Sequence, residues 1–394
     1  MPHTARPALT CFTKRSHACI RMFSGVVLIT FSSLYHHDRF LPALMNVVGM
    51  LREETNFLQL KNYTILHSQS DYSSPAIIYQ CPTGSLIEWG TIKGKQRAGL
   101  SDFRTGVIST FLVSLLLRMP FFIDCHVFSE LYEENMINWK WHGAGQYSAK
   151  NGTVKYLDQY NVANSFIDDI DRCVQNVVQS NRGIIARLED SSIEELKKWG
   201  LSRQSAFSVA HNYLFKSKKE LQLHGVEKTR MSPMINLQIR IGDEEIHGSC
   251  RSDAQECPLS EEKKAFVQQF VKCTSKVHRS RNLTKSTIYI LSDCECLKNQ
   301  LKSQFESTLD TEVLVEKEPA VTRGEYDKTH VMHSFMGALS EATRAEFFVI
   351  SRKSGVGRQV VALAQKFDHT FWGDMGDQCE ALDFNAVAHG WSGL

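Results

Sequence analysis

The stretch Ile235-Asn236-Leu237-Gln238-Ile239-Arg240-Ile241-Gly242-Asp243 decides how the second half of the chain folds. Its apolar residues predict a buried strand over 235–241, and the glycine and carboxylate that follow predict a turn at the strand's carboxyl end. Short apolar runs then alternate with longer helical patterns, which is typical of α/β architecture with a mainly parallel sheet. The expected strands cover 287–291, 312–315 and 347–350, and the expected helices cover 261–277, 295–306, 331–344 and 356–366.

The first half of the chain shows the same alternation. Apolar runs predict strands over 76–79 and 120–124, and the almost continuously apolar segment 103–118 predicts an interior helix, with Ser101 or Asp102 as its N-cap. The segment 157–227 is polar and helical in pattern, and Ser191 has the form of a capped helix start. We expect this segment to bridge two α/β units and a ligand cleft to lie between them, at the carboxyl ends of the strands.

The length and the charge of the chain narrow the possible functions. At 394 residues the chain exceeds one compact core, since a domain typically contains about 150 residues. With 42% hydrophobic and 22% charged residues, the composition is that of a folded globular protein and not of a disordered one. The net charge of +2 gives no bulk attraction for nucleic acid, so we expect no nucleic-acid partner.

The N-terminal segment has the pattern of a membrane anchor. Four basic residues precede the apolar run 22–35, which is shorter than the roughly 20 residues that cross a bilayer and lacks a small-residue cleavage site after it. We expect an uncleaved signal anchor, which makes the protein a single-pass type II membrane protein of the Golgi or endoplasmic reticulum lumen. Glycosylation sequons at Asn62, Asn151 and Asn282 favour the same compartment. The alternative is an N-terminal helix that packs on the folded domain.

The cysteines also suit an oxidising compartment. Nine of the eleven cysteines follow the apolar run, and because nine is odd we expect one of them to stay unpaired. Cys250 and Cys257 are spaced to close a small loop. Cys294 and Cys296 lack the two-residue spacer of a zinc knuckle, so the cysteines are interpreted as structural and no metal site is expected.

Three turns carry residue types that bind anions. The first, 99–106, ends at the N-terminus of the expected interior helix, where backbone N–H groups and the helix dipole attract a negative or hydroxyl-bearing ligand. The second, 238–243, places Arg240 in an otherwise apolar strand, which is costly unless the guanidinium meets an anion. The third, 351–358, is a turn that contains serine, glycine and three cations, and it ends at the N-terminus of an expected helix. The structural alternatives are a strand-to-helix turn, an internal salt bridge and a solvated surface turn.

Taken in order, these turns resemble the conserved blocks of the fucosyltransferase-like superfamily, in particular its α-1,2/α-1,6 and protein O-fucosyltransferase branches. The similar segments are GLSDF at 99–103, FFID at 121–124, QIRIGD at 238–243, IYILSD at 288–293, LS at 339–340 and SRKSGVGR at 351–358. They lie within residues 76–370. Each block is short, so their order and spacing carry more weight than any one of them.

The resemblance implies an α/β protein of GT-B fold, in which two Rossmann-like domains face each other across a cleft. The implied order is a cytosolic tail and signal anchor at 1–45, a stem at 46–70, an acceptor domain with a helical segment at 71–228 and a donor domain at 229–394. It also implies GDP-fucose as the donor, a glycan or glycoprotein as the acceptor, and an inverting transfer in which Arg240 neutralises the β-phosphate.

The site residues implied by the resemblance lie on the matching blocks. The donor-binding residues are Gln238, Arg240, Gly242, Asp293, Ser354, Gly355, Val356 and Arg358, and the catalytic residues are Arg240, Asp243 and Asp102. The general base is left open among Asp102, Asp243, Glu244 and Glu245. No cofactor and no metal are expected, because arginine and a helix dipole supply the positive charge.

Departures from the family's pattern leave two alternatives open. Ser101 and Phe103 stand where the family has a glycine and an arginine, Gln238 replaces a histidine, and Lys353 and Val356 differ in the last block. Gln238 still donates a hydrogen bond but cannot be charged, and Phe103 removes a cation. The alternatives are a transferase for another nucleotide sugar and a catalytically silent glycan-binding protein on the same fold.

Overall fold

The computed structural model describes a discontinuous set of segments of the chain. The described residues are 60–70, 74–81, 100–142, 154–158, 166–179, 183, 188–218, 234–241, 257, 259–283, 285–309, 311–315, 328–352 and 354–382. The chain divides into two compact units, Met1–Thr55 and Asn56–Leu394, and every described residue belongs to the second. The expected cytosolic tail and anchor, with the apolar run 22–35, therefore lie outside the described residues.

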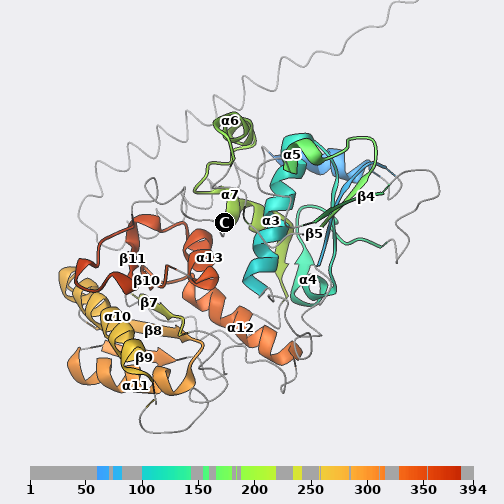
Figure 1. The fold of residues 1–394 in the computed structure, drawn as a ribbon. Coiled ribbons are helices and arrows are strands. Elements are labelled where there is room, and N and C mark those ends of the chain that lie inside the picture. Colours follow the sequence, from blue (N-terminus) through green and yellow to red (C-terminus); the bar gives the residue numbers. More distant parts are fainter. Residues whose placement is uncertain are drawn as a thin grey trace, which may run out of the picture. The chain divides into compact units, whose positions relative to one another are not determined.

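The first sheet has four parallel strands in the order β2-β1-β5-β4 (Figure 1). The strands are β1 (Ile77–Gln80), β2 (Phe121–Asp124), β4 (Val154–Asp158) and β5 (Gln175–Gln179). β1 and β2 confirm the strands expected at 76–79 and 120–124. A run of apolar residues with a turn on either side is enough to fix a buried parallel strand.

The interpretation of 157–227 as a helical bridge is confirmed for the helices at Asp190–Lys198 and Ala206–Leu214, but it is wrong for the strand β5, which belongs to the first sheet. β5 lies between β1 and β4, pairing Asn176 with Ile77 on one side and with Lys155 on the other. Only Val177 and Val178 in β5 are apolar, so the strand has no periodic signal of its own. Its position is fixed by pairing with β1, which is a tertiary contact and not a local preference.

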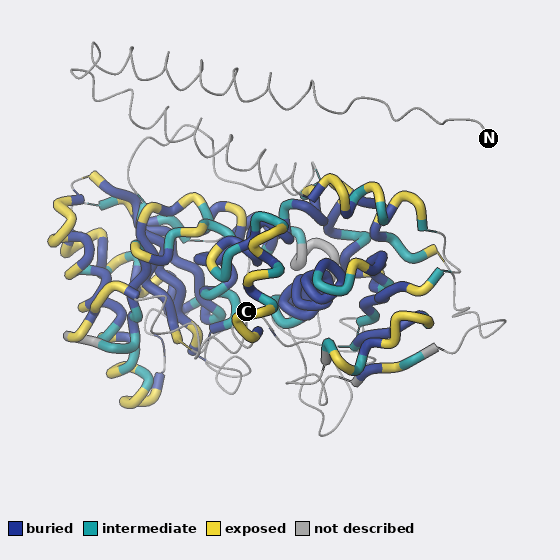
Figure 2. Tube along the Cα trace, turned by 90° about the horizontal axis from the view of Figure 1, so that it is seen from above, coloured by how far each residue is buried: buried dark blue, intermediate teal, exposed yellow. Residues whose placement is uncertain are grey.

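The long apolar helix is α3 (Leu100–Leu117), and it is buried along most of its length (Figure 2). It is the one described helix long and apolar enough to cross a membrane, but 78% of it is buried inside the fold, as expected of a core helix. The N-cap expected at Ser101 or Asp102 is wrong, because both residues lie inside the first turn. Leu100 and Phe103 are buried on one face, and this burial extends the helix N-terminally.

The second sheet has five parallel strands in the order β11-β10-β7-β8-β9. The strands are β7 (Met234–Ile239), β8 (Ser286–Ser292), β9 (Thr311–Val315), β10 (Phe347–Ile350) and β11 (Thr370–Trp372). Apolar residues on one face of this sheet pack with α10 (Glu261–Ser280) and α11 (Glu295–Thr308), and those on the other face pack with α12 (Lys328–Ala342) and α13 (Gly355–Ala364). The four helices and four of the five strands agree with expectation, while β11 adds an edge strand.

Shorter elements connect and cover the first sheet. They are α4 (His126–Leu131), β3 (Tyr132–Glu134), α5 (Phe166–Asp169), α6 (Asp190–Lys198), α7 (Ala206–Leu214) and β6 (Phe215–Ser217). In the second sheet, two 3₁₀ turns, η3 (Phe367–His369) and η4 (Gly373–Gln378), flank β11. β3 and β6 pair antiparallel. The capped helix start expected at Ser191 is wrong: Ser191 lies inside α6, whose N-cap is Glu189 without a side-chain cap.

Part of the segment expected to be a stem is packed into the core. Residues 60–68 form a helix, and Leu60 and Tyr63 are fully buried. The Tyr63 hydroxyl donates to the carbonyl of Met119 at 2.8 Å and lies 2.9 Å from the Ser114 hydroxyl. This helix is therefore attached to the end of α3.

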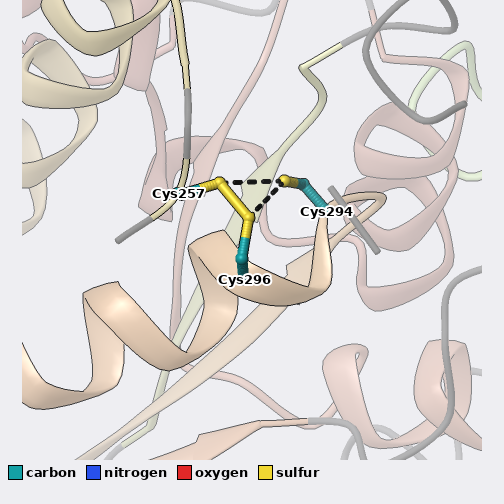
Figure 3. A group of neighbouring side chains, drawn as sticks. All are labelled: Cys257, Cys294 and Cys296. Atoms are coloured by element: carbon teal, nitrogen blue, oxygen red, sulfur yellow. Dashed lines mark hydrogen bonds between the residues drawn. A yellow bond between two sulfur atoms is a disulfide. The ribbon is translucent and has the colours of Figure 1, made fainter. Parts of the chain in front are cut away.

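The cysteines form three described disulfides, which join Cys81 to Cys125, Cys257 to Cys296 and Cys273 to Cys379. The Cys250–Cys257 loop is therefore wrong, because Cys257 pairs with a residue 39 positions away. Figure 3 shows the sulfur of Cys294 beside this disulfide, 3.6 Å from each of its sulfurs. Since a disulfide offers no thiolate, this cluster is not a preformed metal site. Among the described residues Cys173 is free and exposed.

Candidate functional site

The second and third predicted turns lie at the same edge of the second sheet. Gln238 pairs with Ile350 on β10, and Ile239 pairs with Ser292 on β8, so the three strands end level with one another. Because the strands are parallel, the residues that follow them gather at the carboxyl edge. These residues include Arg240, Asp293 and Ser351.

Arg240 lies beyond the strand and not inside it. β7 ends at Ile239, and the Arg240 side chain is exposed at the carboxyl edge, so the expected strand over 235–241 with a buried arginine is corrected. The backbone that follows is held on both sides. The N–H of Ile241 donates to Asp293 Oδ1 at 2.9 Å, and Lys263 Nζ donates to the Ile241 carbonyl. An exposed cation on a fixed backbone is accessible to an anionic ligand.

The third turn caps the last helix of the second sheet. Ser354 is fully buried, and its Oγ accepts a hydrogen bond from the N–H of Gly357 at 3.2 Å, so it is the N-cap of α13. Gly357 lies against the second turn: a Cβ there would meet Gln238 Oε1 at 2.7 Å and Ile350 Cβ at 3.1 Å. Only glycine lets the helix approach β7 this closely. The Gln238 Oε1 is buried without a hydrogen-bond donor among the described residues.

The first predicted turn meets the third at a contact that we call the helix junction, formed by Ser101 and Asp102 of α3 and by Gly355, Arg358 and Gln359 of α13. A Cβ on Gly355 would lie 3.1 Å from Ser101 Oγ and 3.8 Å from Asp102 Oδ1. The buried Gln359 Nε2 donates to the Ser101 carbonyl and to the hydroxyl of Thr105, the latter at 2.8 Å. The first and third turns are thus in direct contact, although Thr105 and Gln359 are 254 positions apart in the sequence.

The helix junction contains a charge pair at two helix N-termini. Burial lowers the pKa of the Arg358 guanidinium, and the carboxylate of Asp102 opposes this effect. The guanidinium remains charged, because arginine does not lose its proton in proteins. Its Nε atom is buried without a hydrogen-bond acceptor among the described residues. Val356 is half-buried in the same first turn.

Several predicted site residues cannot be placed. Gly99, Gly242, Asp243, Glu244, Glu245 and Lys353 lie outside the described residues. Of the predicted catalytic residues, Arg240 lies at the sheet edge and Asp102 lies at the helix junction. Asp293 is half-buried, with one oxygen used to fix the backbone after Arg240.

One buried cation was missed by the sequence analysis. Arg104, in the first turns of α3, is 1% exposed, and its Nη2 lies 3.0 Å from Nε2 of His211 on α7. Its Nε and Nη1 atoms are buried without partners among the described residues. The signal was present in the sequence, since Arg104 lies inside the almost continuously apolar run 103–118, whose other charged residue, Arg118, stands at its very end. Phe103, next to it, is buried in the core.

Comparisons with known proteins bear on the fold. No protein-family model and no curated protein matches the chain by sequence. Among solved structures, an arginine-to-lysine mutant of Arabidopsis thaliana FUT1 in complex with GDP is similar with a TM-score of 0.54 and 13% identity, over 78% of this chain and 76% of that chain. NodZ alpha-1,6-fucosyltransferase soaked with GDP-fucose is less similar, with a TM-score of 0.45 and 9% identity over 74% of this chain and 93% of that chain. The likeness to FUT1, together with the two parallel sheets, confirms the expected GT-B fold class.

Proposed function

We propose that the protein transfers fucose from GDP-fucose to a hydroxyl of a glycan or glycoprotein, with inversion and without a metal. The observation that carries the proposal is the convergence of three separate turns at one sheet edge, where Ser101 and Asp102 meet Gly355 and Gly357 meets Gln238. The fold shared with a fucosyltransferase that was solved with GDP supports the choice of donor.

The N-terminus of α13 would hold the donor pyrophosphate. The N–H groups in the first turn of a helix have no intrahelical partner, and the helix dipole favours negative charge there. The N–H of Gly357 is already taken by Ser354, which leaves those of Gly355 and Val356 for the ligand. Arg358, with its Nε buried and unpartnered, would add a positive charge at the same place.

Arg240 would act on the leaving group. In the transfer the acceptor oxygen bonds to C1 of fucose as the bond from C1 to the β-phosphate oxygen breaks, and the electron pair goes to the phosphate of GDP. The acceptor proton passes to a base. A fixed cation beside the phosphate stabilises the charge that develops in the transition state, which is a large catalytic contribution. Asp102 is the described candidate for the base.

The decisive experiment measures GDP release from GDP-fucose with a panel of glycan acceptors. We expect release by the wild-type protein and its loss in Arg240→Ala, with an unchanged melting temperature because Arg240 is exposed. The matched control is Arg279→Ala, an exposed arginine in the last turn of α10, which should leave release unchanged. Wild-type turnover in Arg240→Ala would contradict the assignment, and absence of release with every acceptor would favour the silent glycan-binding alternative.

The donor class has its own test. A bound nucleotide sugar raises the melting temperature in proportion to its affinity, so a panel of GDP- and UDP-sugars should show the largest shift with GDP-fucose. A larger shift with another sugar nucleotide would move the assignment to that donor.

The proposed location is the lumen of the Golgi or endoplasmic reticulum, with an N-terminal membrane anchor. Three disulfides support an oxidising compartment, and Asn62 and Asn282, which begin two of the sequons, are exposed. Loss of the mobility shift caused by glycosidase treatment in an Asn62→Gln, Asn282→Gln double variant would test it. A full-length protein without glycans would argue against this compartment.

A further inference from the structure

Arg104 is a buried positive charge that has no negative partner among the residues that the structure describes. Its side chain is 1% exposed, and the hydrogen bond to His211 is its one polar contact among the described residues. Isolated charges are expensive to bury, and arginine cannot escape the cost by losing its proton. A buried cation of this kind normally pairs with a carboxylate.

The two described groups that interact with Arg104, His211 and Tyr132, are neutral. Burial and, to a smaller extent, the charge of Arg104 together lower the pKa of His211 to about 3. The neutral ring therefore accepts from Arg104 at Nε2, while its Nδ1 lies 3.2 Å from the side-chain oxygen of Asn212. Burial raises the pKa of Tyr132, so its phenol is also neutral. These groups solvate the guanidinium without balancing its charge.

The surroundings of Arg104 also contain a donor that can change partners. Tyr132 is fully buried, and its hydroxyl donates to the thioether sulfur of Met336 at 3.6 Å. A thioether is a weak acceptor, so the hydroxyl gains when a charged oxygen becomes available. Arg104 itself keeps two unpartnered atoms, Nε and Nη1, near the N-terminus of an 18-residue helix, and helical side chains point back toward that end.

We propose that Arg104 forms a second anion-binding site at the N-terminal end of α3, which takes a phosphate-class group of a substrate. The helix dipole, the two free guanidinium donors and the Tyr132 hydroxyl all favour an oxyanion there. Its side chains differ from Arg240 and from the α13 residues, although the first turn of α3 adjoins α13 at the helix junction. It does not require that the donor be GDP-fucose, because any substrate with a phosphate group supplies the same chemistry.

Whether the melting temperature rises or falls when Arg104 is replaced distinguishes an anion-binding role of Arg104 from a purely structural one. Replacing an uncompensated buried charge with an apolar side chain of similar length costs little stability or increases it. Arg104→Met should therefore keep or raise the melting temperature and weaken the binding of inorganic pyrophosphate by about tenfold or more, as expected when charged hydrogen bonds are lost. Arg104→Lys, which keeps the charge, should retain part of the binding.

The experiment uses the full chain and titration calorimetry with inorganic phosphate, pyrophosphate and GDP. Arg118→Met is the matched control, because Arg118 follows the other end of α3, is 68% exposed and pairs with Glu195; it should change neither binding nor melting temperature. Loss of pyrophosphate and GDP binding in Arg104→Met would identify the donor diphosphate as the ligand, and loss of phosphate binding alone would identify a separate anion.

Three outcomes would overturn the proposal. They are unchanged binding of all three anions in Arg104→Met, a lowered melting temperature or failure to fold in that variant, and no anion binding by the wild-type protein. The proposed transfer has a different failure: a wild-type protein that binds pyrophosphate through Arg104 but releases no GDP would refute transfer and leave the anion site standing.

Discussion

The first turns of α3 and α13 meet at the helix junction, yet their cations lie in opposite environments. α13 begins with a serine cap and two glycines, and its cation, Arg358, is half-buried beside the carboxylate of Asp102. The cation of α3, Arg104, is buried in the interior, where the described partner of its guanidinium is a neutral histidine. The α13 end is thus shaped by close backbone approach, and the α3 end by a buried charge. Experiments on the two ends should therefore respond to different variables, pH at one and side-chain size at the other.

The largest expected effect is on the α3 side and depends on pH. The ordinary pKa of His211 is 6.5, and burial lowers it to about 3 in the folded protein. Between these values the unfolded chain takes up a proton that the folded chain excludes, so the stability is full above pH 6.5 and falls as the pH is lowered. The free energy of unfolding should drop by roughly 2–3 kcal/mol from about pH 6.5 to about pH 4.5 through this residue.

Urea unfolding of wild-type and His211→Gln protein over this pH range measures that loss. Glutamine keeps an acceptor for Arg104 but does not titrate, so the variant should lose less stability on acidification. His126→Gln is the matched control for the chemical change, since His126 is exposed on α4 and lies outside the surroundings of Arg104. Equal slopes in wild type and His211→Gln would show that His211 is not held neutral by its surroundings.

The parts of the fold that could be predicted from the sequence are those fixed by contacts between neighbouring residues. The strand 347–350 and the turn 351–358 that leads into a helix follow from neighbouring residues, and both appear as predicted. β5 carries only two apolar residues and is fixed by pairing with β1, which no local pattern encodes. Cys257 likewise pairs with Cys296, 39 positions away, and not with the nearer Cys250.

The site shows the same division between local and distant information. The three turns were recognised because each joins a strand or a glycine turn to polar residues, and the contact of the first turn with the third came from the structure. The environment of each residue could not be read in this way. Arg240 was expected to lie inside an apolar strand over 235–241, but the strand ends at Ile239, one residue before Arg240. Arg104 was overlooked because its burial depends on α7, more than 100 positions away.

An intermediate effect is expected on the α13 side, and it depends on size. A Cβ on Gly357 would meet the Gln238 amide oxygen at 2.7 Å, closer than real contacts allow, and the Ile350 side chain at a tight 3.1 Å. A Cβ on Gly355 would have one tight contact, the Ser101 hydroxyl at 3.1 Å, and this hydroxyl can rotate. Gly357→Ala should therefore lower the free energy of unfolding by about 1–2 kcal/mol, with overpacking partly offset by the better helix propensity of alanine. Gly355→Ala should change it by less than about 0.5 kcal/mol.

Denaturant midpoints of the two glycine variants, measured together, test this asymmetry. Both variants add the same methyl group, so they differ only in the residues that this methyl group would contact. If both variants were equally stable, the close approach of α13 to β7 would be absent in solution, and the special character of the α13 end would have to lie in charge alone.

The smallest expected effect separates capping from ligand binding at the α13 end. Ser354 caps α13 and Ser260 caps α10, each accepting from an N–H three residues later, at 3.2 and 3.3 Å. Loss of either cap to alanine should cost about 1 kcal/mol of stability, since the same kind of hydrogen bond is removed. Only Ser354→Ala should also weaken GDP binding, because Ser354 belongs to the proposed phosphate cradle and Ser260 does not. Thermal melting with and without GDP gives both quantities, and an equal GDP-induced shift in the two variants would mean that Ser354 only ends the turn and begins the helix.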